Sequence, residues 1–537
     1  MALLLFPPGE SFRRSMNWCH TWFGIALGGL LFAIFWMGTL TVVDSEIDQW
    51  MKPELRMTFD DGGGSVILDD LVLPRLQGEA KIGSFVIITL PKKREPFLEY
   101  SFDNLEGERT SVKLNPRDGT YIAETESEAA SDFFYSFHYM LHIRWNNIGL
   151  WLVGFSSMAM LVLIVSGIFI HRKIFADFFT FRPWKALRRS TLDLHNLTSV
   201  VALPFYFFIT VSGLLILFMI FLPWPISAIY SGDDGAFRDD YFGFVSLSEE
   251  NPQAAEMQSL DQYLIQAANI WTERTGSPEV ADVLYINNFG TENATVTARQ
   301  LFTSKRVEVG KETLVFDAIS GHILKDFSAG PARHAHTWLV GLHYIQFDHW
   351  PLRWLYLVCG LMGCVMIATG NLFWMRARIR TGREQTVQVR VIRALTVGAV
   401  SGIIIATGAF LIANRLLPAE AALLGNGRAA LEIWAFFLTW ISTFIHAAVR
   451  DKAAWRDQCW VIAVLGVSAI LLNWITTGDH IPAMISEGIW SVASMDLILL
   501  AGALTAIWAA LRLKKSETTG AFSKHVQTEP SDEAQAR

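Results

Sequence analysis

The sequence predicts a polytopic α-helical membrane protein, and three observations support that fold class. Hydrophobic residues make up 52% of the 537 residues, while charged residues make up only 18%. Counted with glycine and without tyrosine, the apolar fraction is roughly 57%, against about 45–50% in soluble domains. The apolar residues gather in uncharged blocks of about 20 residues, the length that a helix needs to cross a bilayer. These observations exclude a soluble enzyme.

Eight apolar blocks follow one another along the chain. The first four spans are predicted at 18–43, 138–170, 195–222 and 336–375, with uncharged cores at 148–170 and 355–375 in the second and fourth. Four more spans are predicted within 394–515, in blocks at 394–414, 430–449, 460–476 and 489–511. Each block has the length and composition expected of a membrane-spanning helix.

Short basic connections predict the orientation of the spans. Arginine and lysine are concentrated in 171–194 after the second span, in 376–393 after the fourth, and in the residues after the sixth and eighth. Basic short loops remain in the cytoplasm, so both termini are expected there. The N-terminal 1–17 has too short an apolar run for a signal peptide, and the polar tail 516–537 is predicted to be disordered.

The pattern of the first four spans indicates an internal duplication, in which two spans form one repeat. In the first and third spans a histidine is followed eighteen residues later by a glycine, as His20 by Gly38 and His195 by Gly213. In the second and fourth spans the spacing is 25 and 27 residues, from His142 to Gly167 and from His343 to Gly370. The last four spans have no such partner and form an appendix.

Each half also contains a long acid-rich segment that is expected outside the membrane. These segments are 44–137 and 223–335, and each contains a hairpin pattern, SVKLNPRDGTYI at 111–122 and TLVFDAISGHIL at 313–324. Alternating strands around a turn with Asp or Asn and Gly are typical of β-hairpins. The second segment also has a helical apolar pattern at 260–276. Each segment is therefore predicted to be a small helix-on-sheet domain.

Four histidines occupy matched positions in the two repeats. His20 and His195 begin their spans at the cytoplasmic face, while His142 and His343 precede theirs at the outer face. Ionisable groups in spans are costly and are usually functional, and imidazole is a common axial ligand of haem iron. The sequence has no Cys-x-x-Cys-His motif, which excludes covalent c-type haem. The pairs predict two bis-histidine sites that transfer electrons.

Two further histidines compete for these positions. His138 lies one helical turn from His142 and can replace it, and His171 competes with His20 or His195. A single interfacial histidine is more often a polar side chain that reaches for headgroups, but four at matched positions favour ligation. Arg144 and Arg353 lie near the outer pair, where a guanidinium could hold a haem propionate or simply anchor a helix.

At these residues the chain resembles the PepSY-associated transmembrane family of iron-uptake membrane proteins, which includes bacterial ferric-siderophore reductases. The resemblance covers about 12–378 and is carried by NWCHTWFGIALGG, LHIRWNNIGLWLVGF with IVSGIFI, DLHNLTSVVALPF with TVSGLL, and GLHYIQF with LRWLYLVCGLMG and IATGNLFW. In the third span Ser199 or Val200 stands where a glycine commonly follows the histidine.

The resemblance implies a bacterial inner-membrane protein with a duplicated four-helix haem-binding bundle and two periplasmic α+β PepSY-like domains, followed by four additional C-terminal transmembrane helices. It also implies two b-type haems held by His20, His142, His195 and His343. The function implied is transfer of electrons to a ferric siderophore or another Fe(III) chelate.

No Gly-x-Gly-x-x-Gly motif follows a strand, so the sequence predicts a quinol or a separate cytoplasmic reductase as the electron donor. Two alternatives stay open. One is an iron or chelate transporter, for which Pro204 is the one candidate break in a span. The other is a PepSY-type regulatory protein without redox activity, which leaves the matched histidines without a role. No feature indicates a nucleic-acid partner.

Overall fold

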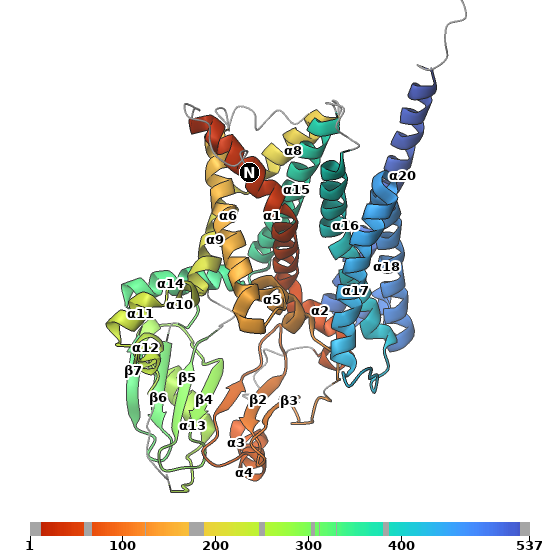
Figure 1. The fold of residues 1–537 in the computed structure, drawn as a ribbon. Coiled ribbons are helices and arrows are strands. Elements are labelled where there is room, and N and C mark those ends of the chain that lie inside the picture. Colours follow the sequence, from red (N-terminus) through yellow and green to blue (C-terminus); the bar gives the residue numbers. More distant parts are fainter. Residues whose placement is uncertain are drawn as a thin grey trace, which may run out of the picture. The chain divides into compact units, whose positions relative to one another are not determined.

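A computed structural model describes residues 12–57, 67–123, 125–170, 187–245, 253–301, 307–310, 312–328, 330–379 and 386–526 (Figure 1). The chain divides into two compact units. The helical unit comprises Met1–Pro53, Thr125–Leu203 and Cys359–Arg537, and the sheet unit comprises Glu54–Glu124 and Pro204–Val358. Each unit therefore contains residues from both halves of the duplication.

Long helices account for most of the chain. The longer ones are α1 (Phe12–Leu40), α5 (Ala130–Met140), α6 (Ile148–Ile170), α8 (Leu187–Val201), α9 (Leu203–Ile216), α14 (Pro331–Tyr344), α15 (Trp350–Ile379), α16 (Val387–Leu416), α17 (Arg428–Arg450), α18 (Ala454–Thr477) and α20 (Trp490–Val526). Among the described residues, six segments are long and apolar enough to cross a membrane, and the bent pair of α8 and α9 makes a seventh. The structure therefore agrees with a polytopic membrane protein.

The predicted blocks all fall on helices, although several boundaries differ. Segment Arg428–Thr477 contains two helices, α17 and α18, of 23 and 24 residues. The second span begins only at α6, because Leu141 and His142 adopt left-handed backbone angles, each with φ 55°, and end α5. The fourth span begins at α15, since Ile345 (φ 57°) ends α14. Helix α20 runs on to Val526, past the predicted start of the disordered tail at Ser516.

The third predicted span is broken. Helices α8 and α9 meet at Ala202 with a bend of 64°. Pro204 lies in the first turn of α9, and a proline has no backbone N–H to donate to the preceding turn. The residues that follow form short helices, α10 (Phe218–Phe221), α11 (Trp224–Ile229) and α12 (Asp234–Phe242).

One antiparallel sheet joins the two outer segments. Its strands are β1 (Val86–Thr89), β2 (Leu98–Asp103), β3 (Arg109–Leu114), β4 (Val283–Asn287), β5 (Thr295–Arg299), β6 (Glu312–Asp317) and β7 (Ile323–Ser328). The strand order is β3-β2-β1-β4-β5-β6-β7, and β1 pairs with β4 at the centre. The two segments, each of which the sequence predicts to be a small domain, contribute strands to one sheet.

The two predicted hairpins form to different extents. The pattern at 313–324 becomes β6 and β7, joined through Gly321 at φ 75°. The Asp317 side chain accepts hydrogen bonds from the backbone N–H groups of Ile319 and Ser320 in this turn. The pattern at 111–122 forms β3 and only an isolated bridge between Leu114 and Tyr121.

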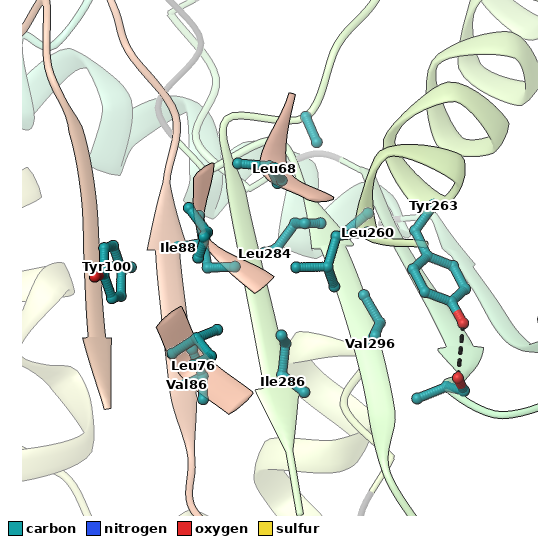
Figure 2. Packing of buried hydrophobic residues seen from close by; sticks show 14 of the residues in the cluster. Leu68, Leu76, Val86, Ile88, Tyr100, Leu260, Tyr263, Leu284, Ile286 and Val296 are labelled. Atoms are coloured by element: carbon teal, nitrogen blue, oxygen red, sulfur yellow. Dashed lines mark hydrogen bonds between the residues drawn. The ribbon is translucent and has the colours of Figure 1, made fainter. Parts of the chain in front are cut away.

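Short helices cover one face of the sheet and close its apolar core. These are α3 (Leu68–Leu71), α4 (Leu73–Glu79) and the predicted helix α13 (Leu260–Thr275). Along β2 the residues alternate between buried and half-buried, as expected when one sheet face packs on a core. The core draws on both outer segments (Figure 2), and the Tyr263 hydroxyl donates to the Ala318 carbonyl across 3.0 Å.

The two segments also cap each other's helices. The Asp261 carboxylate accepts from the backbone N–H groups of Leu68 (2.8 Å) and Asp69 (3.2 Å) at the start of α3. In return, the Asp69 carboxylate accepts from the N–H of Leu260 (2.7 Å) and from the Ser259 hydroxyl at the start of α13. Side chains that satisfy the first N–H groups of a helix stabilise it. The sheet unit is thus held together by reciprocal contacts between its halves.

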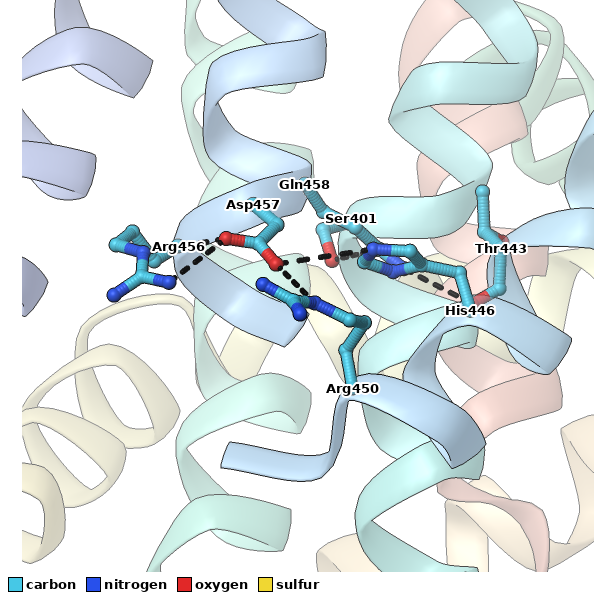
Figure 3. A network of polar contacts seen from close by, with 7 residues as sticks. All are labelled: Ser401, Thr443, His446, Arg450, Arg456, Asp457 and Gln458. Carbon is cyan, nitrogen blue, oxygen red and sulfur yellow. Dashed lines mark hydrogen bonds and ion pairs between the residues drawn. The ribbon is translucent and has the colours of Figure 1, made fainter. Parts of the chain in front are cut away.

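In the helical unit, buried polar contacts connect the C-terminal helices (Figure 3). The Ser401 hydroxyl of α16 donates to the Gln458 side-chain oxygen of α18 (2.6 Å), and the Gln458 amide donates to the Thr443 carbonyl of α17 (3.0 Å). Nearby, Arg450 donates to Asp457 (2.8 Å). Inside a low-dielectric bundle such satisfied pairs fix which helix faces meet.

The reciprocal caps can be tested by substitution. We expect Asp261→Ala to destabilise the sheet unit by about 1–2 kcal/mol, because it removes the acceptor for two helix N–H groups. Hydrogen exchange of the full chain in detergent should show faster exchange of the Leu68 and Asp69 amides. The matched control is Asp70→Ala, an exposed residue of the capped helix α3. Equal protection in the two variants would contradict the cap.

Candidate functional site

Two histidines face each other inside the helical unit. His20 of α1 and His195 of α8 have ring centroids 6.3 Å apart and ring planes at 80°. Two imidazoles that bind one metal ion from opposite sides have centroids about 6 Å apart, since a metal–imidazole bond measures about 2.0–2.1 Å and the ring centre lies about 1 Å further on. The separation therefore fits a bis-imidazole site.

Backbone carbonyls set the tautomer of both rings. His20 Nδ1 lies 3.0 Å from the Leu163 carbonyl oxygen of α6, and His195 Nδ1 lies 2.8 Å from the Met366 carbonyl oxygen of α15. A carbonyl oxygen only accepts hydrogen bonds, so in both rings Nδ1 carries the proton and Nε2 carries the lone pair. Histidines that bind metal ions are commonly oriented in this way, by a hydrogen bond from the ring nitrogen that does not bind the metal.

A glycine lies against each ring. A Cβ placed on Gly167 would come within 3.3 Å of His20 Cε1, and one on Gly370 within 3.1 Å of His195 Cε1. In both cases the carbonyl that accepts from Nδ1 belongs to the residue four positions before the glycine. The histidine of one helix therefore rests in a notch on the next, and the same notch occurs in both halves of the duplication.

The same local arrangement is found at the other end of the repeats. His138 of α5 lies against Gly38, where a Cβ would come within 2.6 Å of its ring, and His138 Nδ1 lies 3.0 Å from the Ile34 carbonyl oxygen. In the sheet unit, His343 of α14 lies against Gly213, where a Cβ would come within 3.0 Å. The acceptor or donor at His343 Nδ1 is the Ser212 hydroxyl, at 3.0 Å.

His142 occupies a different environment. It follows the end of α5, its ring packs edge-on against Phe133 (5.3 Å between centroids) and near Phe437 (6.4 Å), and its Nδ1 lies 3.3 Å from the Ser136 hydroxyl. Burial lowers the pKa of His142, and the positive charge of Arg144 lowers it further. It has no glycine notch in the described contacts. His138, rather than His142, therefore corresponds to His343.

A signal for His138 was present in the sequence. The dipeptide His138-Tyr139 matches His343-Tyr344, and both lie just before the left-handed residue that ends a helix. The sequence also allows Leu141-His142 to be matched with Leu342-His343, and the two alternatives differ by one helical turn. His171, the other competing histidine, lies outside the described residues.

The remaining polar residues near the outer histidines have structural partners. Arg353 is buried, donates to the Ile345 carbonyl (2.9 Å) and stacks on Trp350, while Arg144 is exposed. His336 Nδ1 lies 2.6 Å from the Tyr241 hydroxyl, and burial lowers the pKa of His336. Within the described residues no three or more His, Cys, Asp or Glu side chains gather as a metal site. A bis-imidazole site needs only two.

The fold and these sites define a polytopic membrane protein that has a helical unit and a unit built on one antiparallel sheet. The model of the PepSY-associated TM region matches residues 17–377, and the chain belongs to this family. A Pseudomonas aeruginosa protein, "Uncharacterized protein PA4219", is 25% identical over 303 residues, which cover 53% of this chain and 73% of that one. All four histidine–glycine notches lie within the matched range, and α16 to α20 lie beyond it.

Replacing a notch glycine tests the packing. We expect Gly38→Ala to destabilise the protein by about 1–3 kcal/mol, because its Cβ would overlap the His138 ring and overpacked cores are strained. Gly24→Ala on the same helix is the control, since its Cβ would meet Leu163 at an ordinary 3.8 Å. Thermal unfolding in detergent should show a lower Tm for Gly38→Ala alone. An equal Tm for both variants would mean that the notch is not tight.

Proposed function

We propose that this protein is an inner-membrane di-haem b electron-transfer protein, which passes electrons from the cytoplasmic side or the quinol pool to ferric chelates in the periplasm. The activity would be that of a ferric-siderophore reductase. The observation that carries the proposal is the histidine–glycine notch, which recurs four times with Nδ1 engaged each time. Packing alone does not require the same hydrogen-bonded histidine at four matched positions.

His20 and His195 would hold one haem. For the second we propose His343 together with His138, which takes the place first given to His142. The surroundings of each histidine within its own unit support this choice: His138 and His343 each lie against a glycine, and His142 lies among phenylalanines. Held by two histidines in this way, haem would supply one-electron transfer.

The chain's own residues would prepare these ligands. Donation from Nδ1 to a carbonyl holds the ring in one orientation and raises the basicity of Nε2. Since the carbonyls belong to helices, they do not move with side-chain rotamers. The glycines leave room for the imidazole rings against the neighbouring helices. Ser166 and Ser212 add a hydroxyl beside the glycine in one notch of each half.

In the proposed reaction one quinol would reduce two Fe(III) chelates. A quinol gives up two electrons and two protons, and each Fe(III) chelate takes one electron to become Fe(II). Fe(II) is the softer ion and is held less tightly by the oxygen ligands that suit Fe(III). Reduction outside the membrane would therefore release iron from its chelator.

A transporter of iron or of a chelate is the second candidate. The broken span supports it, since α8 and α9 bend by 64° beside Pro204 and interrupted helices line substrate sites in many transporters. That reading gives the four notches no role. The two candidates differ in whether the protein binds haem.

Haem content tests the ligands. We expect the purified protein to show a dithionite-sensitive, low-spin b-type spectrum, and His20→Ala and His138→Ala each to lose about half of the haem, since each removes one ligand of one bis-imidazole pair. His142→Ala is the matched control and should keep its haem. A colourless protein from haem-replete cells would overturn the proposal. If His142→Ala lost haem and His138→Ala did not, His142 rather than His138 would be the ligand of the second haem.

Electron transfer is tested in sealed vesicles that hold a quinol inside and a ferric chelate outside. We expect Fe(II) to appear outside, detected with a ferrous indicator, because the histidines would provide stations toward both faces. His20→Ala should reduce the rate at least tenfold, while His142→Ala should leave it unchanged. If haem-loaded protein produces no Fe(II) from any chelate, the reductase activity is wrong even though the haem sites stand.

A further inference from the structure

Two arginines are buried together in the sheet unit. Arg299, the last residue of β5, is 6% exposed, and Arg333, in the first turn of α14, is 7% exposed. They meet at Gly310: Arg333 Nη2 donates to its carbonyl (3.0 Å), and Arg299 Nη2 lies 2.9 Å from where its Cβ would be. Gly310 has φ 62°, so a glycine suits both the backbone and the space.

Aromatic rings lie beside both guanidinium groups. The Arg333 Cζ lies 4.5 Å from the ring centre of Phe327 and 5.5 Å from that of Tyr241. The Arg299 Cζ lies 5.5 Å from the ring centres of both Phe242 and Phe244. A guanidinium group holds its N–H donors in one plane, along its edges, which is where an anion pairs with it.

Several of these donors are buried and have no hydrogen-bond partner among the residues that the structure describes. These are Nε and Nη1 of Arg333 and Nε of Arg299. Such donors are costly to leave unpaired, above all on charged groups. Burial lowers the pKa of Arg333 to about 10, and the charge of Arg299 contributes to that shift. Both groups therefore remain protonated at neutral pH.

The nearest carboxylates are engaged elsewhere. Asp282 accepts from the Leu301 N–H (2.5 Å) and pairs with Lys92 (3.5 Å). Glu308 lies 2.5 Å from His334 Nδ1 and accepts from the Thr337 hydroxyl (2.9 Å). These acids reduce the local charge, but neither forms a hydrogen bond with the unpaired guanidinium nitrogens.

We propose that Arg299 and Arg333 form a binding site for a carboxylate-bearing anion, of the class of small organic acids and hydroxycarboxylate chelators. Two oxygens in one plane match the in-plane donors of a guanidinium group. The aromatic rings beside the arginines lower the local dielectric, which strengthens binding of an anion to the guanidinium groups. Phosphate can also pair bidentately with one guanidinium, but an anion with several carboxylates can engage both arginines at once and should bind more tightly.

The position of the site relates it to the proposed function. Arg333 and His343 lie on the same helix, α14, ten residues apart, which corresponds to about 15 Å along the axis. An anion held by Arg333 would therefore lie one helix length from the proposed outer ligand. That the anion is the chelator of a ferric complex rests on the proposed function, whereas the anion site itself does not.

Calorimetry with citrate tests the site on the full chain in detergent. We expect wild-type protein to bind citrate saturably and phosphate at least tenfold more weakly. Arg299→Met and Arg333→Met should each weaken citrate binding at least tenfold, and Arg333→Lys should also weaken it, because an ammonium cannot present a planar donor pair. The matched control is Arg109→Met, which removes an exposed arginine stacked on Phe85 in the same unit and should bind as wild type.

The outcomes separate the two proposals. Absence of citrate binding, or equal losses in Arg109→Met and Arg333→Met, would overturn the anion site, and equal affinity for phosphate would overturn its carboxylate class. Arg333→Lys keeps the charge and shows whether the fold survives, together with circular dichroism and haem content. Citrate binding by a protein without haem would support the site and contradict the reductase. Binding of citrate but not of ferric citrate would overturn the link to iron.

Discussion

The need to engage the Nδ1 atom of a buried imidazole governs these histidine sites. At each of the four sites a glycine leaves room for the ring, and a main-chain or hydroxyl oxygen engages Nδ1. Where that oxygen belongs to a carbonyl, it fixes both the orientation and the tautomer of the ring. The glycine spacings that are visible in the sequence follow from this requirement, because the ring and the notch must lie at the same level on neighbouring helices.

The sequence predicted the features that depend on local pattern and missed those that depend on distant pairing. Spans, the β6–β7 hairpin and α13 followed from apolar periodicity and turn residues. The shared sheet did not, since the β1–β4 pairing joins strands almost two hundred residues apart along the chain and no local pattern specifies an edge partner. The choice between His138 and His142 depended on left-handed angles at Leu141 and His142, which ordinary side chains adopt only in a particular tertiary context.

The C-terminal helices belong to the helical unit although they lie beyond the matched family range. Trp50 at the end of α2 (Asp44–Met51) donates to the buried carboxylate of Asp496 in α20 across 2.7 Å, and Asn473 of α18 donates to the same carboxylate. The Ser127 hydroxyl donates to Glu432 of α17. Buried carboxylates that lose their donors destabilise a bundle strongly. The additional helices are therefore bound to the first repeat by buried polar contacts, in which Trp50 and Ser127 add donors to carboxylates of α20 and α17.

The duplication is expressed in contacts that each half makes with the other. His20 comes from the first repeat and the ring that faces it, His195, from the second. In the sheet unit, Asp69 caps a helix of the second repeat and Asp261 caps one of the first. A single repeat would therefore expose an unpaired histidine in its bundle and uncapped helices on an open sheet edge.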